Sequence, residues 1–153
     1  QSACRRLMVI AAEDVGLAFP QIIPIVNAAV DMALKLGMPE ARIPLGDVAV
    51  LMATSPKSNS GHVALDAALS DVKKGRGLGF PRQLQNVHAD TYTQEREQGY
   101  KYPHDYPNHW VKQQYLPDEG KTFSFWMPQD NPVEAKSKSW MQQCWGEEKP
   151  FSK

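Results

Sequence analysis

Several residues of this chain are of the types that do chemistry, but their spacing matches no catalytic or metal-binding motif. His104-Asp105 with His109 suggests a metal site, yet the spacing is not that of a zinc signature and no cysteine pair accompanies it. Glu13-Asp14 is a carboxylate pair. Neighbouring residues of a helix point in different directions, so these two carboxylates are not placed as a general acid and a general base.

Two further patterns suggest nucleophilic and phosphate chemistry. Lys57-Ser58 could form a serine–lysine nucleophile, but we expect Lys57 to be solvated and Ser58 to cap a helix. The loop from Gly75 to Gly79 is rich in glycine, but a phosphate-binding P-loop needs four residues between its glycines and then Lys-Ser/Thr. No Gly-x-Ser-x-Gly elbow is present either. The sequence therefore predicts a chain with no catalytic residue, no metal and no cofactor.

The most distinctive part of the sequence is a stretch from 99 to 117, where aromatic residues alternate with prolines. Proline bars helix at the residue before it, so this arm must be irregular. It is too aromatic for a disordered linker, and we expect its rings to lie on a helical body or on a neighbouring subunit. The candidates for interface or arm anchoring are Tyr100, Tyr102, His104, Tyr106 and Trp110.

A second interpretation of the arm is nucleic-acid binding. Arg96, Lys101 and Lys112 surround the same rings, and basic residues among aromatics can neutralise and stack on single strands. The prolines favour the other interpretation, in which the rings are pinned inward as packing and the lysines keep the surface soluble. Both interpretations remain open at this point.

The composition limits the class of protein to which this chain can belong. A chain of 153 residues with 42% hydrophobic and 22% charged residues suits one globular domain. Its formal net charge is zero, which argues against a main DNA-binding surface. Cys4 and Cys144 are too few for a disulfide scaffold and predict two free thiols in a reducing cytosol. No apolar run reaches the roughly 18 residues that span a membrane. Because the chain begins with Gln1 and helical sequence follows at once, we expect a piece of a longer protein.

Helical periodicity supplies the elements that must position these residues. We expect four main helices and one shorter one, at about 3–18, 20–36, 38–54, 58–74 and 89–98. The run 48–53 could be a buried strand by periodicity alone, but its alanines favour helix. The fold class is therefore all-α, a helical bundle with a long irregular C-terminal arm.

The second helix is apolar around most of its circumference. It is therefore either the centre of the bundle or a helix that also faces another chain. Val30 falls largely outside its expected inner face. That face consists of Ile22, Val26, Ala29, Ala33 and Leu36. Val63, Ala67 and Val72 are the expected buried face of the fourth helix.

From about Gln129 the chain turns polar and patternless, with Trp140 and Trp145 as isolated anchors. We therefore divide it into a helical oligomerisation domain at 1–128, which includes the arm, and a tail or linker at 129–153.

Four blocks of sequence carry a family resemblance. They are Arg5-Arg6-Leu7 through Ala12-Glu13-Asp14-Val15-Gly16-Leu17-Ala18, Gly37-Met38-Pro39-Glu40-Ala41, Ala53-Thr54-Ser55-Pro56-Lys57-Ser58-Asn59, and Gly99-Tyr100-Lys101-Tyr102-Pro103-His104-Asp105 through Gln114-Tyr115-Leu116-Pro117. With these blocks the chain resembles the C-terminal region of the replication-associated recombination protein A family of AAA+ ATPases, over roughly residues 4–128. The family also includes the Werner-helicase-interacting protein. The segment after Pro128 does not resemble the family's usual end, and the family's module has a further helix upstream.

The resemblance implies an all-helical module similar to the collar of clamp loaders, which assembles the ATPase as a homotetramer. ATP and Mg²⁺ would bind upstream domains, so no catalytic residue carries over to this chain. The whole protein would be a DNA-dependent ATPase at stalled replication forks, in the cytoplasm at the nucleoid. It would have DNA and single-strand-binding protein as partners and no contact with membranes. Two alternatives remain: a single-stranded nucleic-acid-binding module that uses the arm, and a small stand-alone enzyme.

Overall fold

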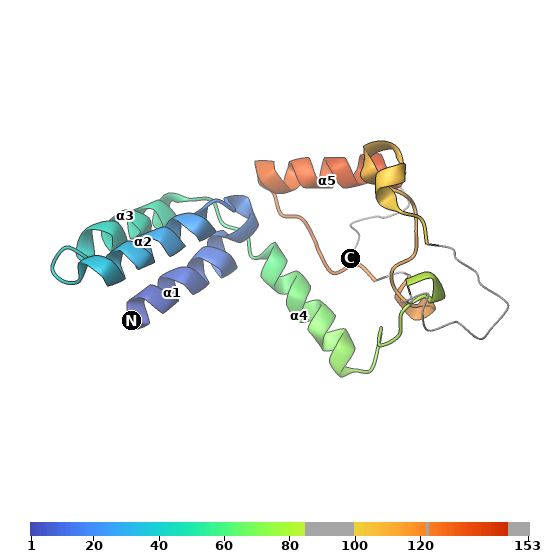
Figure 1. The fold of residues 1–153 in the computed structure, drawn as a ribbon, viewed down its shortest axis with the longest axis horizontal. Coiled ribbons are helices and arrows are strands. Elements are labelled where there is room, and N and C mark those ends of the chain that lie inside the picture. Colours follow the sequence, from blue (N-terminus) through green and yellow to red (C-terminus); the bar gives the residue numbers. More distant parts are fainter. Residues whose placement is uncertain (85–99, 122, 147–153) are drawn as a thin grey trace.

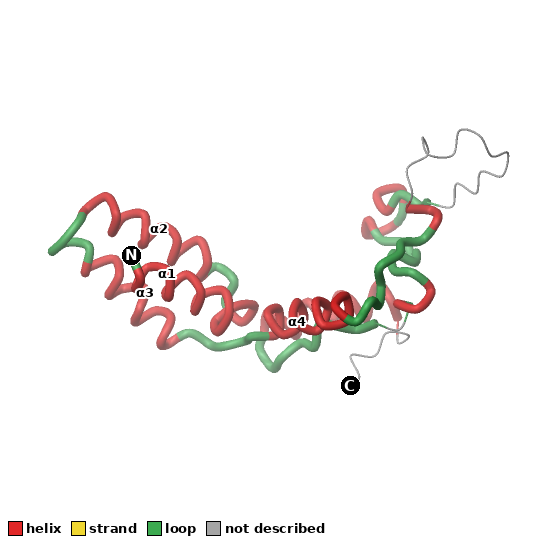
Figure 2. Tube along the Cα trace, turned by 90° about the horizontal axis from the view of Figure 1, so that it is seen from below, coloured by secondary structure: helices red, strands yellow, loops and turns green. Residues whose placement is uncertain are grey.

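A computed structural model describes residues 1–84, 100–121 and 123–146, which form five α-helices and no strand. The expected all-α fold is confirmed. The helices are α1 (Ser2–Ile10), α2 (Ile22–Leu36), α3 (Arg42–Thr54), α4 (Ser60–Lys73) and α5 (Pro132–Trp145). Helices α1 to α3 lie side by side as one layer, and α4, α5 and the arm extend away from it (Figure 1). Figure 2 shows the elongated, curved shape that results.

The hydrophobic core lies within the layer of α1 to α3. Its side chains come from all three helices and include Ala11, Val15, Ile22, Val26, Val48 and Met52. Helix α2 is the central one, as one interpretation of its sequence expects. Leu36 is 52% exposed, however, and Val30 is buried, so the expected inner face is wrong at these two positions. The packing of α1 and α3 on either side of α2 decides which of its apolar residues are covered.

The first helix is not one regular element. After α1 the chain continues as a π-helical turn, Ala11–Val15, and a 3₁₀ helix, Gly16–Ala18. Gly16 has a φ of +47°, which side chains rarely adopt, and its Cα faces the backbone of Ser58. This close approach brings the start of α4 against the end of the first helical segment.

Helices α2 and α3 begin and end close to the expected positions. Gly37, with a φ of +72°, follows the last residue of α2, as the C′ position of a helix favours. Helix α3 includes the run 48–53, so the helical interpretation of that run is confirmed. The nitrogen Nζ of Lys57 donates to the carbonyl oxygens of Met52 (2.7 Å) and Ser55 (2.5 Å), so it satisfies groups at the end of α3.

Helix α4 leaves the layer at the 3₁₀ helix Gly16–Ala18 and then runs away from it (Figure 1). Ser60 is its only buried residue. The expectation that Val63, Ala67 and Val72 form a buried face is wrong, because α1 to α3 do not extend along this helix. Val63 and Val72 are about half exposed, at 49% and 50%.

The polar segment after Gln129 contains a helix that the sequence analysis missed. Asn131 is the N-cap of α5, and its Oδ1 accepts the backbone N–H of Glu134 at 3.0 Å. Pro132 occupies the first helical turn. The expectation of a patternless tail is therefore wrong for Pro132–Trp145. The short helix expected at 89–98 lies outside the described residues.

Candidate interaction surface

A buried carboxylate joins α5 to the rest of the chain. Glu134 is 1% exposed, and its carboxylate accepts hydrogen bonds from the hydroxyl of Ser58, the Nδ2 of Asn131 and the backbone N–H of Gln129. We call these four residues the Glu134 cluster. Ser58 is itself 2% exposed and lies just before α4. The cluster therefore fixes the beginning of α5 against the junction between α3 and α4.

The same cluster controls the pKa of its carboxyl group. Burial raises the pKa of Glu134, but the hydrogen bonds from Ser58, Asn131 and Gln129 outweigh burial and hold it below its usual range. A carboxyl group with a lowered pKa stabilises the folded chain fully above its unfolded-state pKa. This contribution is lost as the pH falls through the lowered value.

We therefore expect the free energy of unfolding to fall between about pH 6 and about pH 3, in part through Glu134. Denaturant titrations at a series of pH values would measure this slope. Glu134→Gln should flatten it, because the amide does not titrate. An identical slope in the variant would contradict the assignment to this group.

The arm places three of its rings in a series. The ring centroids of Tyr102 and His104 are 5.1 Å apart, and those of His104 and His109 are 5.0 Å apart. Two short 3₁₀ helices, Pro103–Asp105 and Pro107–His109, set this arrangement. Each begins at a proline, which is favoured in a first turn. The prolines thus break the arm into single turns instead of pinning its rings inward.

The predicted anchor residues differ in their surroundings. Tyr100, Tyr102 and Tyr106 are 48%, 53% and 38% exposed, and His104 is also exposed. The interpretation in which these rings are internal packing is therefore wrong. Trp110 is half-buried and packs edge-to-face on Trp145 of α5, with ring centroids 5.0 Å apart. Trp145 is thus an anchor, as the sequence indicates, whereas Trp140 is 49% exposed.

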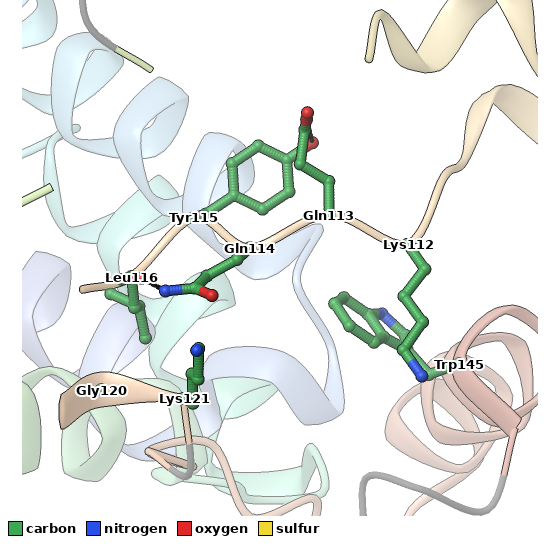
Figure 3. Close-up of a pocket in the computed structure, with 8 residues that line it drawn as sticks. All are labelled: Lys112, Gln113, Gln114, Tyr115, Leu116, Gly120, Lys121 and Trp145. Carbon is green, nitrogen blue, oxygen red and sulfur yellow. Dashed lines mark hydrogen bonds between the residues drawn. The ribbon is translucent and has the colours of Figure 1, made fainter. Parts of the chain in front are cut away.

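A shallow hollow of about 420 Å³ lies where the arm meets the end of α5. Its walls include Lys112, Tyr115, Leu116, Lys121 and Trp145, which Figure 3 shows around the open space. Lys121 forms an ion pair with Asp118 at 2.6 Å. The lining has no histidine, cysteine or carboxylate, so it offers none of the acid–base or nucleophilic pairs that catalysis commonly uses.

The other candidate chemical groups have structural partners. Ser58 donates to Glu134 and the amine of Lys57 donates to carbonyl groups, so they do not form a serine–lysine pair. The backbone N–H of Gly77 in the glycine-rich loop donates to the carboxylate of Glu119 at 2.7 Å. Among the described residues, no group of three or more metal-ligating side chains is placed to hold a metal ion. Cys4 and Cys144 are both free thiols, as expected.

Large apolar side chains are numerous on the described surface. Twenty-three large apolar side chains of the described residues are exposed. Seven side chains of the same kinds are buried, namely Val15, Ile22, Val26, Val30, Val48, Met52 and Val111. Single apolar residues scattered over the surface are normal in a monomeric domain, whereas large contiguous apolar patches mark interaction sites.

The exposed apolar residues of three helices form stripes. On α2, Ile25, Met32 and Leu36 recur at spacings of seven and four and are 38%, 51% and 52% exposed. On α3, Ile43 and Val50 are 58% and 65% exposed. On α4, the stripe consists of Leu65, Leu69 and Val72. Such spacings place residues on one face of a helix, so each stripe has the pattern of a contact surface without its partner.

Comparison with known proteins places this chain in a family. A family model described as "MgsA AAA+ ATPase C terminal" matches residues 1–145. The chain belongs to this family. The replication-associated recombination protein A of Bacillus subtilis is 47% identical over 130 residues, which cover 84% of this chain and 31% of that protein. The protein of the same name from Escherichia coli K12 is 31% identical over 138 residues, which cover 86% of this chain and 30% of that protein.

The family match extends further along the chain than the resemblance seen in the sequence. The resemblance seen in the sequence ended near Pro128, whereas the family match continues to residue 145 and so includes α5. An uncharacterised protein of Thermotoga maritima is similar over 147 residues, at 31% identity, covering 94% of this chain and 23% of that protein. The chain spans about a third of the length of the replication-associated recombination proteins that it matches. No helix of the described residues is long and apolar enough to cross a membrane.

Proposed function

We propose that this chain is the self-association domain of an AAA+ ATPase of DNA replication and recombination, and that it assembles a homotetramer. The family match and the names of the relatives support the parent class. The whole protein would bind ATP, Mg²⁺ and DNA through other domains and act at stalled forks. Its further partner would be single-strand-binding protein, and its location the cytoplasm at the nucleoid.

The observation that carries self-association is the excess of exposed over buried large apolar side chains. Hydrophobic burial is the main favourable term in association, and obligate interfaces are more apolar than ordinary surface. The stripes lie on three different helices, α2, α3 and α4, which suits an assembly with more than one interface. A tetramer with two kinds of twofold contact needs two separate interfaces on each copy.

We expect the aromatic rings of the arm to contribute to the interface between copies, and a double variant tests this contribution. Tyr102→Ala with Trp110→Ala removes an exposed ring and the ring that holds the arm on α5. We expect at least a tenfold weaker association with helix content retained, because aromatic anchors dominate interface energies. Light scattering and circular dichroism would measure the two quantities.

Tyr102→Phe is the matched control for this variant, since it keeps the ring and removes only the hydroxyl group. It should associate as the parent chain does. An intact oligomer together with an unchanged fold in the double variant would exclude the arm from the interface.

A second candidate function is the binding of single-stranded nucleic acid. The exposed series of Tyr102, His104 and His109 rings favours it, because bases stack on such rings. The described arm, 100–121, carries three lysines and three carboxylates, so it has no basic excess. Binding of a labelled oligonucleotide that weakens steeply with salt would support this function.

A further inference from the structure

The stripe on α4 remains about half exposed in the described chain. Leu65, Leu69 and Val72 are 58%, 45% and 50% exposed and follow one another at spacings of four and three. These spacings align the three side chains along one side of the helix. The stripe is not part of the core of α1 to α3, whose buried residues lie elsewhere.

Helix α4 also needs a partner for its own stability. It has 14 residues, of which only Ser60 is buried. Helices of about 12–15 residues are marginal in water by themselves, and most helical stability in proteins comes from packing an apolar face. A second helix laid along the stripe would supply that packing.

We propose that α4 packs antiparallel against α4 of a second copy of this chain, about a twofold axis that passes near Leu69. This inference rests on the self-association proposed above and assigns one of its interfaces. Leu65 then lies opposite the partner's Val72, and Leu69 lies opposite the partner's Leu69. A twofold contact of this kind uses the same surface patch on both copies.

The charges beside the stripe select the antiparallel direction. Asp66 and Lys73 lie on the same flank of the stripe, seven residues apart. An antiparallel pair places Asp66 opposite the partner's Lys73, and does so twice, whereas a parallel pair places this charged flank against the partner's other flank and forms no such ion pair. Residues that flank a helix–helix seam set partner orientation in this way.

The charged groups at the two ends of the stripe are paired within the chain. The Nε2 of His62 lies 3.4 Å from the carboxylate of Asp66, and Arg76 forms an ion pair with Asp71 at 2.9 Å. When His62 approaches the partner's Arg76, each therefore carries a carboxylate beside it. The ends of the pair consequently have no uncompensated like charges.

The opposite flank of the stripe carries small residues. Gly61 and Ala68 lie seven residues apart along this side of α4. Small side chains on one flank let two helix backbones approach closely. The charged flank and the small flank thus give the α4 face a shape and a polarity that its own copy complements.

The stripe continues into a hollow at the start of α4. This hollow, of about 390 Å³, lies between α1 and α4, and its lining combines apolar side chains with the polar ones of Glu13, Ser58 and His62. The apolar part includes Val9, Leu17, Ile23 and Leu65. In the antiparallel pair the partner's Val72 lies opposite Leu65, at the edge of this hollow. The end of the partner's α4 would therefore cover apolar surface of α1 and α2 as well.

Leu69→Glu tests the apolar part of the pairing in the full chain. A carboxylate at the twofold axis meets its own copy, so the dissociation constant from light scattering should rise by at least about 100-fold. Ala67→Glu is the matched control, because Ala67 is exposed on the opposite side of α4. It adds the same charge to the same helix and should leave association unchanged.

Charge reversal tests the orientation. Asp66→Lys alone, or Lys73→Asp alone, turns both cross-pairs into like charges and should weaken association about tenfold. An equal mixture of the two single variants restores both cross-pairs and should recover the parent affinity as a mixed assembly. A mixture no tighter than either variant alone would overturn the antiparallel arrangement.

The two proposals fail differently. A parent chain that remains a monomer at every concentration would overturn self-association, and this pairing with it. A parent chain that associates, combined with a Leu69→Glu variant of unchanged dissociation constant and normal circular dichroism, would overturn the α4 pairing alone.

Discussion

Glu134→Ala is expected to lower the free energy of unfolding by about 3 kcal/mol, because it removes a buried acceptor that satisfies three donors. The hydroxyl of Ser58 and the amide of Asn131 would lose their partner in a site that excludes water. The N–H of Gln129 would lose its acceptor as well. Chemical denaturation at one fixed protein concentration would measure the loss, since association adds to apparent stability.

The same substitution should release α5. Amide hydrogen exchange is expected to show lost protection over Pro132–Trp145, with α1 to α3 retaining theirs, because the core of the layer does not include this cluster. Glu40→Ala, at an exposed carboxylate, is the control and should change stability by less than about 0.5 kcal/mol. Unchanged protection of α5 in Glu134→Ala would refute the role of the cluster as its attachment.

Gly16→Ala is expected to destabilise the chain by at least about 3 kcal/mol. The residue has a φ of +47° and a ψ of −130°, a conformation that suits glycine. In addition, a Cβ at this position would overlap the carbonyl oxygen of Ser58, and a backbone atom cannot swing aside as a long side chain can. The backbone N–H of Ser58 donates to the carbonyl of Asp14 at 2.9 Å. Moving the backbone at Ser58 away from the added Cβ would therefore also strain this hydrogen bond.

Gly46→Ala provides the matched control for Gly16. It is the same substitution inside helix α3, where a Cβ would meet open space. Alanine is favoured over glycine in a helix interior by roughly 0.5–1 kcal/mol, so this variant should be slightly more stable than the parent. Equal effects of the two variants would show that the close approach at Gly16 does not limit stability.

Much of the α1 to α3 layer could be predicted from the sequence, because local rules decide it. Pro20 lies just before α2 and Gly37 directly follows it. The backbone preferences of these two residues mark the limits of the helix. The inner face of α2 was predicted correctly at Ile22 and Val26, where periodicity and packing agree. The π-helical turn was not predictable in this way; it ends at Gly16, which lies against the backbone of Ser58, a residue distant in sequence.

Helix α5 could have been found, because its start signal is local. Asn131-Pro132-Val133-Glu134 combines an N-cap, a proline in the first turn and a glutamate three residues after the cap. The weak apolar periodicity of Pro132–Trp145 concealed this signal. The role of Glu134 itself was not predictable, since Ser58 lies 76 residues away in sequence.

The exposure of α4 and of the arm could not be predicted from the sequence. Sequence periodicity predicts that Leu65, Leu69 and Val72 share a face of the helix. It does not predict whether that face is covered by the same chain or by another copy. In the arm, Trp110 packs on Trp145. Whether Tyr102 contacts another subunit stays a prediction, as does the division of the chain after residue 128.

The central claim is that the exposed apolar faces are interfaces between copies of this chain. Its most direct test is the absolute mass of the chain in solution, measured by light scattering on a sizing column over a concentration series. The account predicts a stable mass near four times 17.1 kDa, with dissociation only at the lowest concentrations. A mass of 17.1 kDa at every concentration would contradict it.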